Sequence, residues 1–138
     1  MSIIGIGTDL VDIARFQRLI DRRGTQFLGR WFREAELTYC WAQNIPARHV
    51  AARFAAKEAV LKSLHQPHTG PPPWRDIEIV RSAEGLPDVR LHGMVRDLAR
   101  AARICALHVS MSHDARYATA TVVAIGDASP THRCSGAE

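Results

Sequence analysis

Residues 47–64 read Ala-Arg-His-Val-Ala-Ala-Arg-Phe-Ala-Ala-Lys-Glu-Ala-Val-Leu-Lys-Ser-Leu. The segment is rich in helix-forming Ala, Leu, Lys and Glu and contains no Gly or Pro, which predicts a helix over its whole length. On a helical wheel, Val50, Phe54, Leu61 and Leu64 form an apolar stripe, and small residues, mostly alanines, line the opposite side. Because neither side is clearly solvated, we expect this helix to lie at the centre of the fold.

The charged residues Arg53, Lys57, Glu58 and Lys62 interrupt the middle and end of this apolar helix. Charges on a buried helix need partners or a ligand, and the three cations suit the phosphates of a ligand. Glu58 and Lys62, four residues apart, could also form an ordinary pair of modest stabilising effect. The lack of a solvated face weighs against that simpler interpretation.

The remaining pattern predicts an α+β fold, with a mainly antiparallel sheet packed around the central helix. Strands are expected at 3–6, 77–80, 89–91, 107–112 and 117–125, and further helices at about 12–23, 33–41 and 94–104. The Pro-rich segment 65–74 is predicted to be a loop. We expect a single domain over 1–125 and a disordered tail over 126–138.

Gly5 and Gly7 interrupt the first predicted strand, which indicates that its backbone approaches another segment closely. Asp9 follows just past the expected end of that strand. Together with Glu58 it offers two hard oxygen donors, which suit a magnesium ion that also takes phosphate oxygens and water. Alternatively, Asp9 caps the helix that begins near residue 12.

Composition restricts the class of protein but not its function. The chain has 138 residues, 46% hydrophobic and 23% charged, which is typical of a globular domain, and its apolar runs are too short to span a bilayer. The N-terminal segment lacks the basic start of a secretory signal, so a cytoplasmic protein is expected. No Walker loop, GxGxxG, HExxH or GxSxG motif occurs.

The net charge of +4 comes from sixteen arginines and only two lysines among 18 basic residues. Such a surplus indicates an anionic partner, which could be a nucleic acid, an acidic protein or a phosphorylated small molecule. Arg15, Arg18 and Arg22 share one face of the first predicted helix. That face is either a solvated surface or a docking site.

Three segments together resemble a known family. They are Gly5-Ile6-Gly7-Thr8-Asp9-Leu10-Val11-Asp12-Ile13, Arg53-Phe54-Ala55-Ala56-Lys57-Glu58-Ala59-Val60-Leu61-Lys62 and His108-Val109-Ser110-Met111-Ser112-His113-Asp114. Their order and spacing are similar to the signature blocks of holo-[acyl-carrier-protein] synthases, the small trimeric class of 4'-phosphopantetheinyl transferases. The resemblance extends from about residue 3 to residue 125.

This resemblance implies a magnesium-dependent transfer of 4'-phosphopantetheine from coenzyme A to a serine of an acyl carrier protein, with adenosine 3',5'-bisphosphate as the other product. By position, Asp9 and Glu58 match the metal ligands of the family, and Lys62 would neutralise the pyrophosphate. Arg53 and His113 match positions near the 3'-phosphate of coenzyme A. Either Glu58 or a metal-bound water could accept the serine proton.

The resemblance also implies that Arg15, Arg18 and Arg22 dock the acidic carrier protein, and that the chain forms a homotrimer with coenzyme A bound between subunits. Whether the carrier serves fatty-acid or polyketide synthesis stays open. The Pro-rich segment 65–73 departs from the usual glycine-rich sequence there. An alternative hypothesis is a non-catalytic basic module that binds RNA or an acidic protein, although only nine residues are aromatic and no strand pairs them for base stacking.

Overall fold

The computed structural model describes residues 1–65 and 70–127 of the chain. In chain order, the described elements are β1 (Ser2–Asp12), α1 (Ile13–Arg23), the 3₁₀ helix η1 (Thr25–Arg30), α2 (Glu34–Trp41), α3 (Pro46–Leu64), the 3₁₀ helix η2 (Trp74–Asp76), β2 (Ile77–Arg81), β3 (Pro87–Leu91), α4 (Gly93–Ala101), β4 (Ile104–His113) and β5 (Tyr117–Gly126). The predicted α+β class is confirmed.

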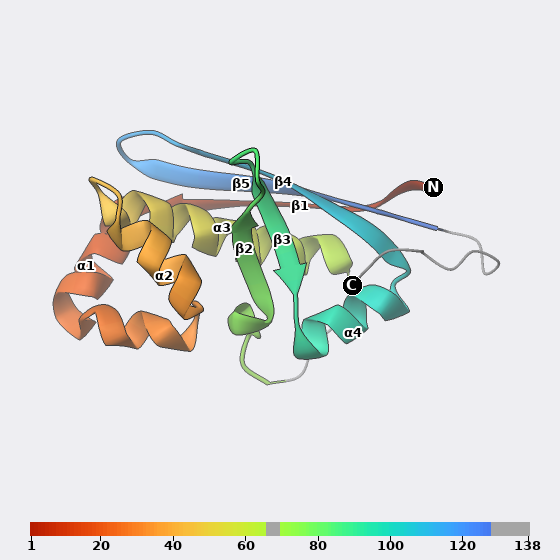
Figure 1. Ribbon diagram of the computed structural model, residues 1–138, viewed down its shortest axis with the longest axis horizontal. Helices are drawn as coiled ribbons and strands as arrows, with labels where there is room; N and C mark the ends of the chain where they lie inside the picture. Colours follow the sequence, from red (N-terminus) through yellow and green to blue (C-terminus); the bar gives the residue numbers. More distant parts are fainter. Residues whose placement is uncertain (66–69, 128–138) are drawn as a thin grey trace.

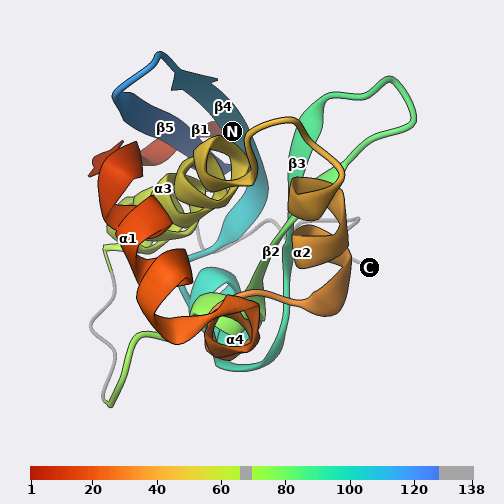
Figure 2. The same ribbon diagram turned by 90° about the vertical axis from the view of Figure 1, so that its left-hand side faces the viewer.

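Two antiparallel sheets surround the long helix α3. One sheet has the strand order β1-β5-β4, and the other is the hairpin β2-β3. The three-stranded sheet extends along α3, α1 and α2 lie near one end of that helix, and the hairpin crosses its side (Figures 1 and 2). The sheet and the hairpin thus cover different sides of α3.

Helix α3 is central, as its sequence predicts. Thirteen of its 19 residues are buried, so almost no side of it meets solvent. Gly5 and Gly7 of β1 explain how the sheet comes so close: a Cβ atom at either position would lie within 2 Å of the carbonyl oxygen of Ser63 or Ala59. The two glycines therefore allow direct contact between the backbones of β1 and α3.

The first strand is longer than predicted, and this changes the element to which Asp9 belongs. Strand β1 continues to Asp12 because it stays paired with β5, where Asp9 lies opposite Ala120. Asp9 is therefore inside the strand and not past its end. The capping role considered for Asp9 belongs to Asp12, whose Oδ1 accepts a hydrogen bond of 3.0 Å from the backbone N–H of Ala14.

Other boundaries differ by a few residues. The helix predicted over 94–104 ends at Ala101 in α4, because Arg103 adopts a left-handed conformation with φ of 61° and β4 starts at Ile104. Gly126, assigned to the tail, is the last residue of β5. Residues 128–138 of the predicted tail and residues 66–69 of the Pro-rich loop lie outside the described residues. Within the described ranges, no helix is both long and apolar enough to cross a membrane.

Candidate active site

Asp9 contacts Lys62 where β1 packs on α3, and Glu58 lies one helical turn before that lysine. The Nζ atom of Lys62 lies 3.1 Å from Oδ1 of Asp9 and 3.0 Å from the carbonyl oxygen of Thr8. Glu58 precedes Lys62 by one helical turn, so its side chain projects from the same side of α3. The Asp9–Lys62 contact therefore places Asp9 against the side of α3 that also carries Glu58.

The Glu58 carboxylate has one oxygen engaged. Its Oε1 accepts a hydrogen bond of 2.5 Å from the indole Nε1 of Trp74, and no hydrogen bond to Oε2 is recorded in the described part of the chain. No group of three or more His, Cys, Asp or Glu side chains could hold a metal ion within residues 1–65 and 70–127. Two carboxylates without further protein ligands fit magnesium, which usually takes one or two carboxylates and completes its shell with phosphate oxygens and water.

Lys57, considered above as a phosphate-binding cation, has a different role. Its side chain is fully buried, and Nζ donates to Oε1 of Glu36 (2.8 Å) and to the carbonyl oxygens of Trp74 (2.9 Å) and Ile77. Burial lowers the pKa of Lys57 to about 8, against the opposing attraction of Glu36. The assignment of Lys57 to phosphate was wrong because all three ammonium protons already have protein acceptors.

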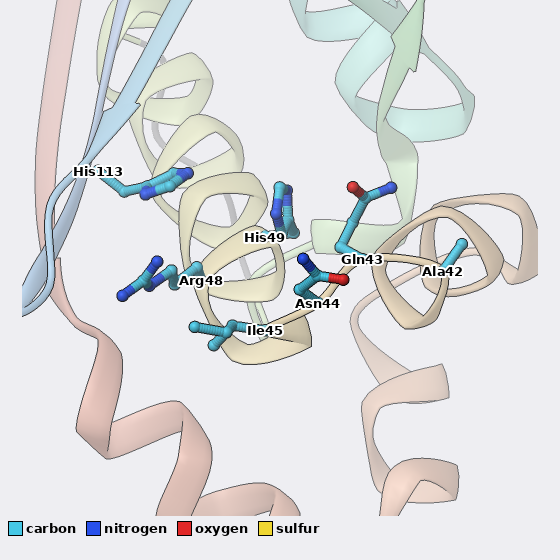
Figure 3. A pocket seen from close by; sticks show the side chains of 7 residues that line it. All are labelled: Ala42, Gln43, Asn44, Ile45, Arg48, His49 and His113. Carbon is cyan, nitrogen blue, oxygen red and sulfur yellow. The ribbon is translucent and has the colours of Figure 1, made fainter.

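His113 contributes to a second cluster, at the N-terminal end of α3. A pocket of about 320 Å³ is lined there by Ala42, Gln43, Asn44, Ile45, Arg48, His49 and His113. The His113 side chain points from the end of β4 toward α3, where Arg48 and His49 occupy the first turns (Figure 3). The rings of His49 and His113 meet edge to face with 5.6 Å between centroids. Three side chains that can carry positive charge thus converge on one pocket.

Arg53 lies one helical turn after His49 on α3 and is only 2% exposed. Its guanidinium carbon sits 4.1 Å from the centroid of the Tyr39 ring, and that of Arg81 sits 4.7 Å from the same ring. The Nε atom of Arg53 is buried without a hydrogen-bond partner in the described residues. A buried guanidinium with an unsatisfied donor is a favourable anion partner.

The cationic side chains around the pocket influence the protonation of His49. Burial lowers the pKa of His49, and the nearby charges of His113, Arg53, Arg81 and Arg48 lower it further. The acidic neighbour Asp114 is engaged elsewhere: its Oδ1 accepts the backbone N–H groups of Arg116 and Tyr117, which lower its pKa. The pocket therefore concentrates positive charge and suits a phosphate.

The carboxylate pair and the cationic pocket lie on different sides of α3. Arg53 and Glu58 are five residues apart, which corresponds to a separation of about 140° around the helix. His49 lines the pocket, whereas Lys62 contacts β1 and Glu58 accepts a hydrogen bond from Trp74. The chain thus presents two groups of candidate site residues on different sides of α3.

Arg15, Arg18 and Arg22 are exposed along α1, as predicted. No ion pair is recorded for any of them in the ranges that the structure describes. Their positive charge is therefore not neutralised by side chains of the described chain.

Several residues of the candidate site were not predicted from the sequence. Arg48 and His49 could have been suspected, because His49 precedes Arg53 by one turn on the same face of the helix. Tyr39, Trp74 and Arg81 come from other elements, and no local spacing connects them to α3. Only the tertiary fold reveals their contacts.

Comparison with known proteins decides the family. The model of the 4'-phosphopantetheinyl transferase superfamily matches residues 5–122 of this chain. The chain belongs to this superfamily. A holo-[acyl-carrier-protein] synthase of Clavibacter michiganensis is 47% identical over 126 residues, which cover 91% of this chain and 98% of the relative.

Solved structures of the superfamily share the same fold. The holo-[acyl-carrier-protein] synthase of Neisseria meningitidis matches with a TM-score of 0.79 and 33% identity, covering 90% of this chain and 99% of that one. The Helicobacter pylori enzyme, solved in complex with coenzyme A, matches with a TM-score of 0.74 and 32% identity, covering 87% of this chain and 99% of its own. The fold and family inferred from the three sequence blocks are confirmed.

Proposed function

We propose that this chain is a cytoplasmic enzyme that transfers 4'-phosphopantetheine from coenzyme A to a serine of apo-acyl carrier protein. Its membership in the superfamily and the coenzyme A complex of the Helicobacter pylori relative support this assignment. The observation in this chain that supports it most is the contact of Asp9 with Lys62 at the boundary of β1 and α3, one helical turn from Glu58. Two carboxylates beside a mobile cation suit a magnesium-bound pyrophosphate.

Each residue has a part in the proposed transfer. Asp9 and Glu58 would hold magnesium, which supplies positive charge to the pyrophosphate when it is bound. Lys62, whose side chain is 53% exposed, can turn from Asp9 toward a pyrophosphate oxygen. As the serine oxygen attacks the β-phosphorus, the bond to the adenosine 3',5'-bisphosphate breaks, and Glu58 is within the site to receive the serine proton.

The direct test is mass spectrometry of an apo-carrier protein incubated with this chain, coenzyme A and magnesium. We expect the carrier to gain one phosphopantetheine group on its serine. A carrier that keeps its mass, while a known transferase modifies the same preparation, would exclude the proposed activity.

We further propose that the active unit is a homotrimer with its sites between subunits. The outer face of the three-stranded sheet exposes large apolar side chains, with Ile6 at 57% and Leu10 at 64% exposure. An apolar sheet face of this kind is typical of a protein interface. An intersubunit site would also let coenzyme A reach the carboxylates of one copy and the cationic pocket of the next. Sedimentation equilibrium should give three times the chain mass of 15.3 kDa.

The cationic pocket is proposed to bind the 3'-phosphate of coenzyme A through His113 and Arg53. We expect His113→Ala and Arg53→Ala to reduce the preference for coenzyme A over 3'-dephospho-coenzyme A. A lost charged hydrogen bond of about 1.5–3 kcal/mol corresponds to a reduction of roughly 10- to 100-fold in kcat/KM discrimination.

His113 is exposed, so its variant tests binding without disturbing the core, whereas Arg53 is buried. His108→Ala, on an exposed position of the same strand, is the matched control and should leave discrimination unchanged. Unaltered discrimination in the His113 variant would mean that the 3'-phosphate binds elsewhere.

Arg15, Arg18 and Arg22 are proposed to dock the acidic carrier protein. Reversing Arg15 and Arg22 to Glu should raise the KM for the carrier steeply and leave the KM for coenzyme A nearly unchanged. Each exposed charge contributes about 1 kcal/mol or less at physiological ionic strength, but several act together in steering the partner. Added salt should weaken carrier binding more in the wild type than in the variant.

Arg96 and Arg100, exposed on α4, provide a control with the same change of net charge. Their reversal should leave carrier kinetics at the wild-type level. If reversal of Arg96 and Arg100 raises the KM for the carrier as much as reversal of Arg15 and Arg22, only net charge matters and α1 is not the docking surface.

A further inference from the structure

We propose that Trp74 is a positioning residue whose indole N–H orients the Glu58 carboxylate toward a divalent cation. This inference rests on the proposed function, in which Glu58 is a metal ligand. The Nε1 atom of Trp74 donates to Oε1 of Glu58 over 2.5 Å. An indole N–H can only donate, so it can hold one carboxylate oxygen but cannot take the place of a ligand itself.

The indole is held firmly by aromatic neighbours. The Trp74 ring packs against Trp31 with 5.1 Å between centroids and against Phe54 with 5.2 Å. Phe54 and Trp31 also contact each other, at 5.7 Å, and both contact Phe16 of α1. Because the ring is fixed by this cluster, the direction of its N–H is fixed as well.

Two consecutive residues of α3 hold Trp74 at two points. Lys57 donates to the Trp74 carbonyl oxygen over 2.9 Å, and Glu58 accepts from its side chain. The backbone N–H of Trp74 donates to the carbonyl of Pro72 over 3.0 Å. Backbone and side chain of Trp74 are thus both attached, so the residue has little freedom to turn its N–H away from Glu58.

The fixed indole N–H restricts the conformation of the Glu58 side chain. A glutamate has three side-chain torsions, and one on a partly exposed helix position would otherwise sample several rotamers. With Oε1 held by Trp74, the carboxylate is restrained on the side of α3 that also carries Lys62, whose Nζ contacts Asp9. Partners that orient a metal ligand in this way change metal affinity without touching the metal.

Trp74→Phe tests the inference, because it keeps an aromatic ring in the cluster and removes the N–H. With manganese as the probe, binding to the full chain in the presence of coenzyme A is followed by electron paramagnetic resonance of the free ion. We expect the affinity for manganese to fall about 10-fold or more, as is typical for loss of a partner of a metal ligand. In the Glu58→Gln background, Trp74→Phe should cause no further loss.

Trp31→Phe is the matched control, since it alters the same cluster but not the hydrogen bond to Glu58. It should leave manganese affinity unchanged. If Trp74→Phe lowers the melting temperature like Trp31→Phe but keeps wild-type manganese affinity, Trp74 is only a core residue and the inference is wrong. A wild-type chain that binds no manganese with coenzyme A would instead contradict the proposed function.

A measurement on the intact indole covers the case in which the Trp74 variant does not fold. In protein labelled at the tryptophan nitrogens, the Nε1–H proton of Trp74 should exchange slowly with solvent. Its resonance should shift in the Glu58→Gln variant. It should also shift when coenzyme A and magnesium are added to the wild type in the absence of manganese. Trp41, which lies at the end of α2, serves as the internal reference. If the Trp74 resonance shifts neither in the Glu58→Gln variant nor on addition of coenzyme A and magnesium, the inference is wrong.

Discussion

Asp9→Asn and Glu58→Gln variants are expected to fold normally and to transfer phosphopantetheine at least about 1,000-fold more slowly than the wild type. The physical reason is that a bound metal ion stabilises the transition state by several kcal/mol, and each 1.36 kcal/mol changes the rate tenfold. The amides keep the shape of the carboxylates but remove the charge that a divalent cation needs. Rates are measured by mass spectrometry of the carrier at saturating coenzyme A.

Stability should change little in these variants. The Asp9–Lys62 pair is partly exposed, with 18% and 53% side-chain exposure, and such pairs contribute about 1 kcal/mol or less. Glu84→Gln, in the exposed turn between β2 and β3, is the control for loss of one negative charge and should keep full activity. Near-normal transfer by either site variant, or by the wild type in excess EDTA, would refute the metal assignment.

The central helix shows what could be predicted from local sequence. The helix predicted over 47–64 is observed as Pro46–Leu64, because helix-forming residues run through the whole segment and both its apolar stripe and its side of small residues can be buried. The same logic identified Gly5 and Gly7 as points of close approach, and the structure shows their partner to be the backbone of α3. These features depend on short-range composition and on simple steric limits.

Strand β1 shows where local sequence was insufficient. Residues 8–12 contain two aspartates, which are poor strand formers, and the strand persists there because β5 pairs with it up to Asp12. That pairing brings Asp9 alongside α3. The two carboxylates could be proposed from sequence, but the contact that places Asp9 against α3 joins it to Lys62, 53 positions away.

The cationic pocket was foreseen only in part. His113 and Arg53 were named from the resemblance, whereas Tyr39, Arg48 and His49 join them through packing of α2, α3 and the end of β4. Likewise, the aromatic residue Trp74 carries no sequence signal for contact with Glu58. Side chains that meet across several elements are set by tertiary structure, which a single sequence does not display.

Substitution of Lys57 is expected to have the largest effect on the free energy of unfolding. We expect Lys57→Met to lower the free energy of unfolding by about 3–5 kcal/mol, since it leaves the Glu36 carboxylate buried without its counter-ion. Glu36 is 2% exposed, and its oxygens also accept the backbone N–H groups of Arg33 and Ile79, so it cannot turn to solvent without breaking those bonds. The carbonyls of Trp74 and Ile77 would lose their donor as well.

Lys62→Met on the same helix is the matched control, with the same substitution in an exposed pair. It should cost about 1 kcal/mol or less in stability but slow transfer, because Lys62 is proposed to meet the pyrophosphate. Urea denaturation of both variants at one protein concentration gives the comparison, since an oligomer's stability depends on concentration. If Lys57→Met were no less stable than Lys62→Met, the buried pair would not hold α2, α3 and the start of β2 together, and the phosphate-binding role rejected for Lys57 would have to be reconsidered.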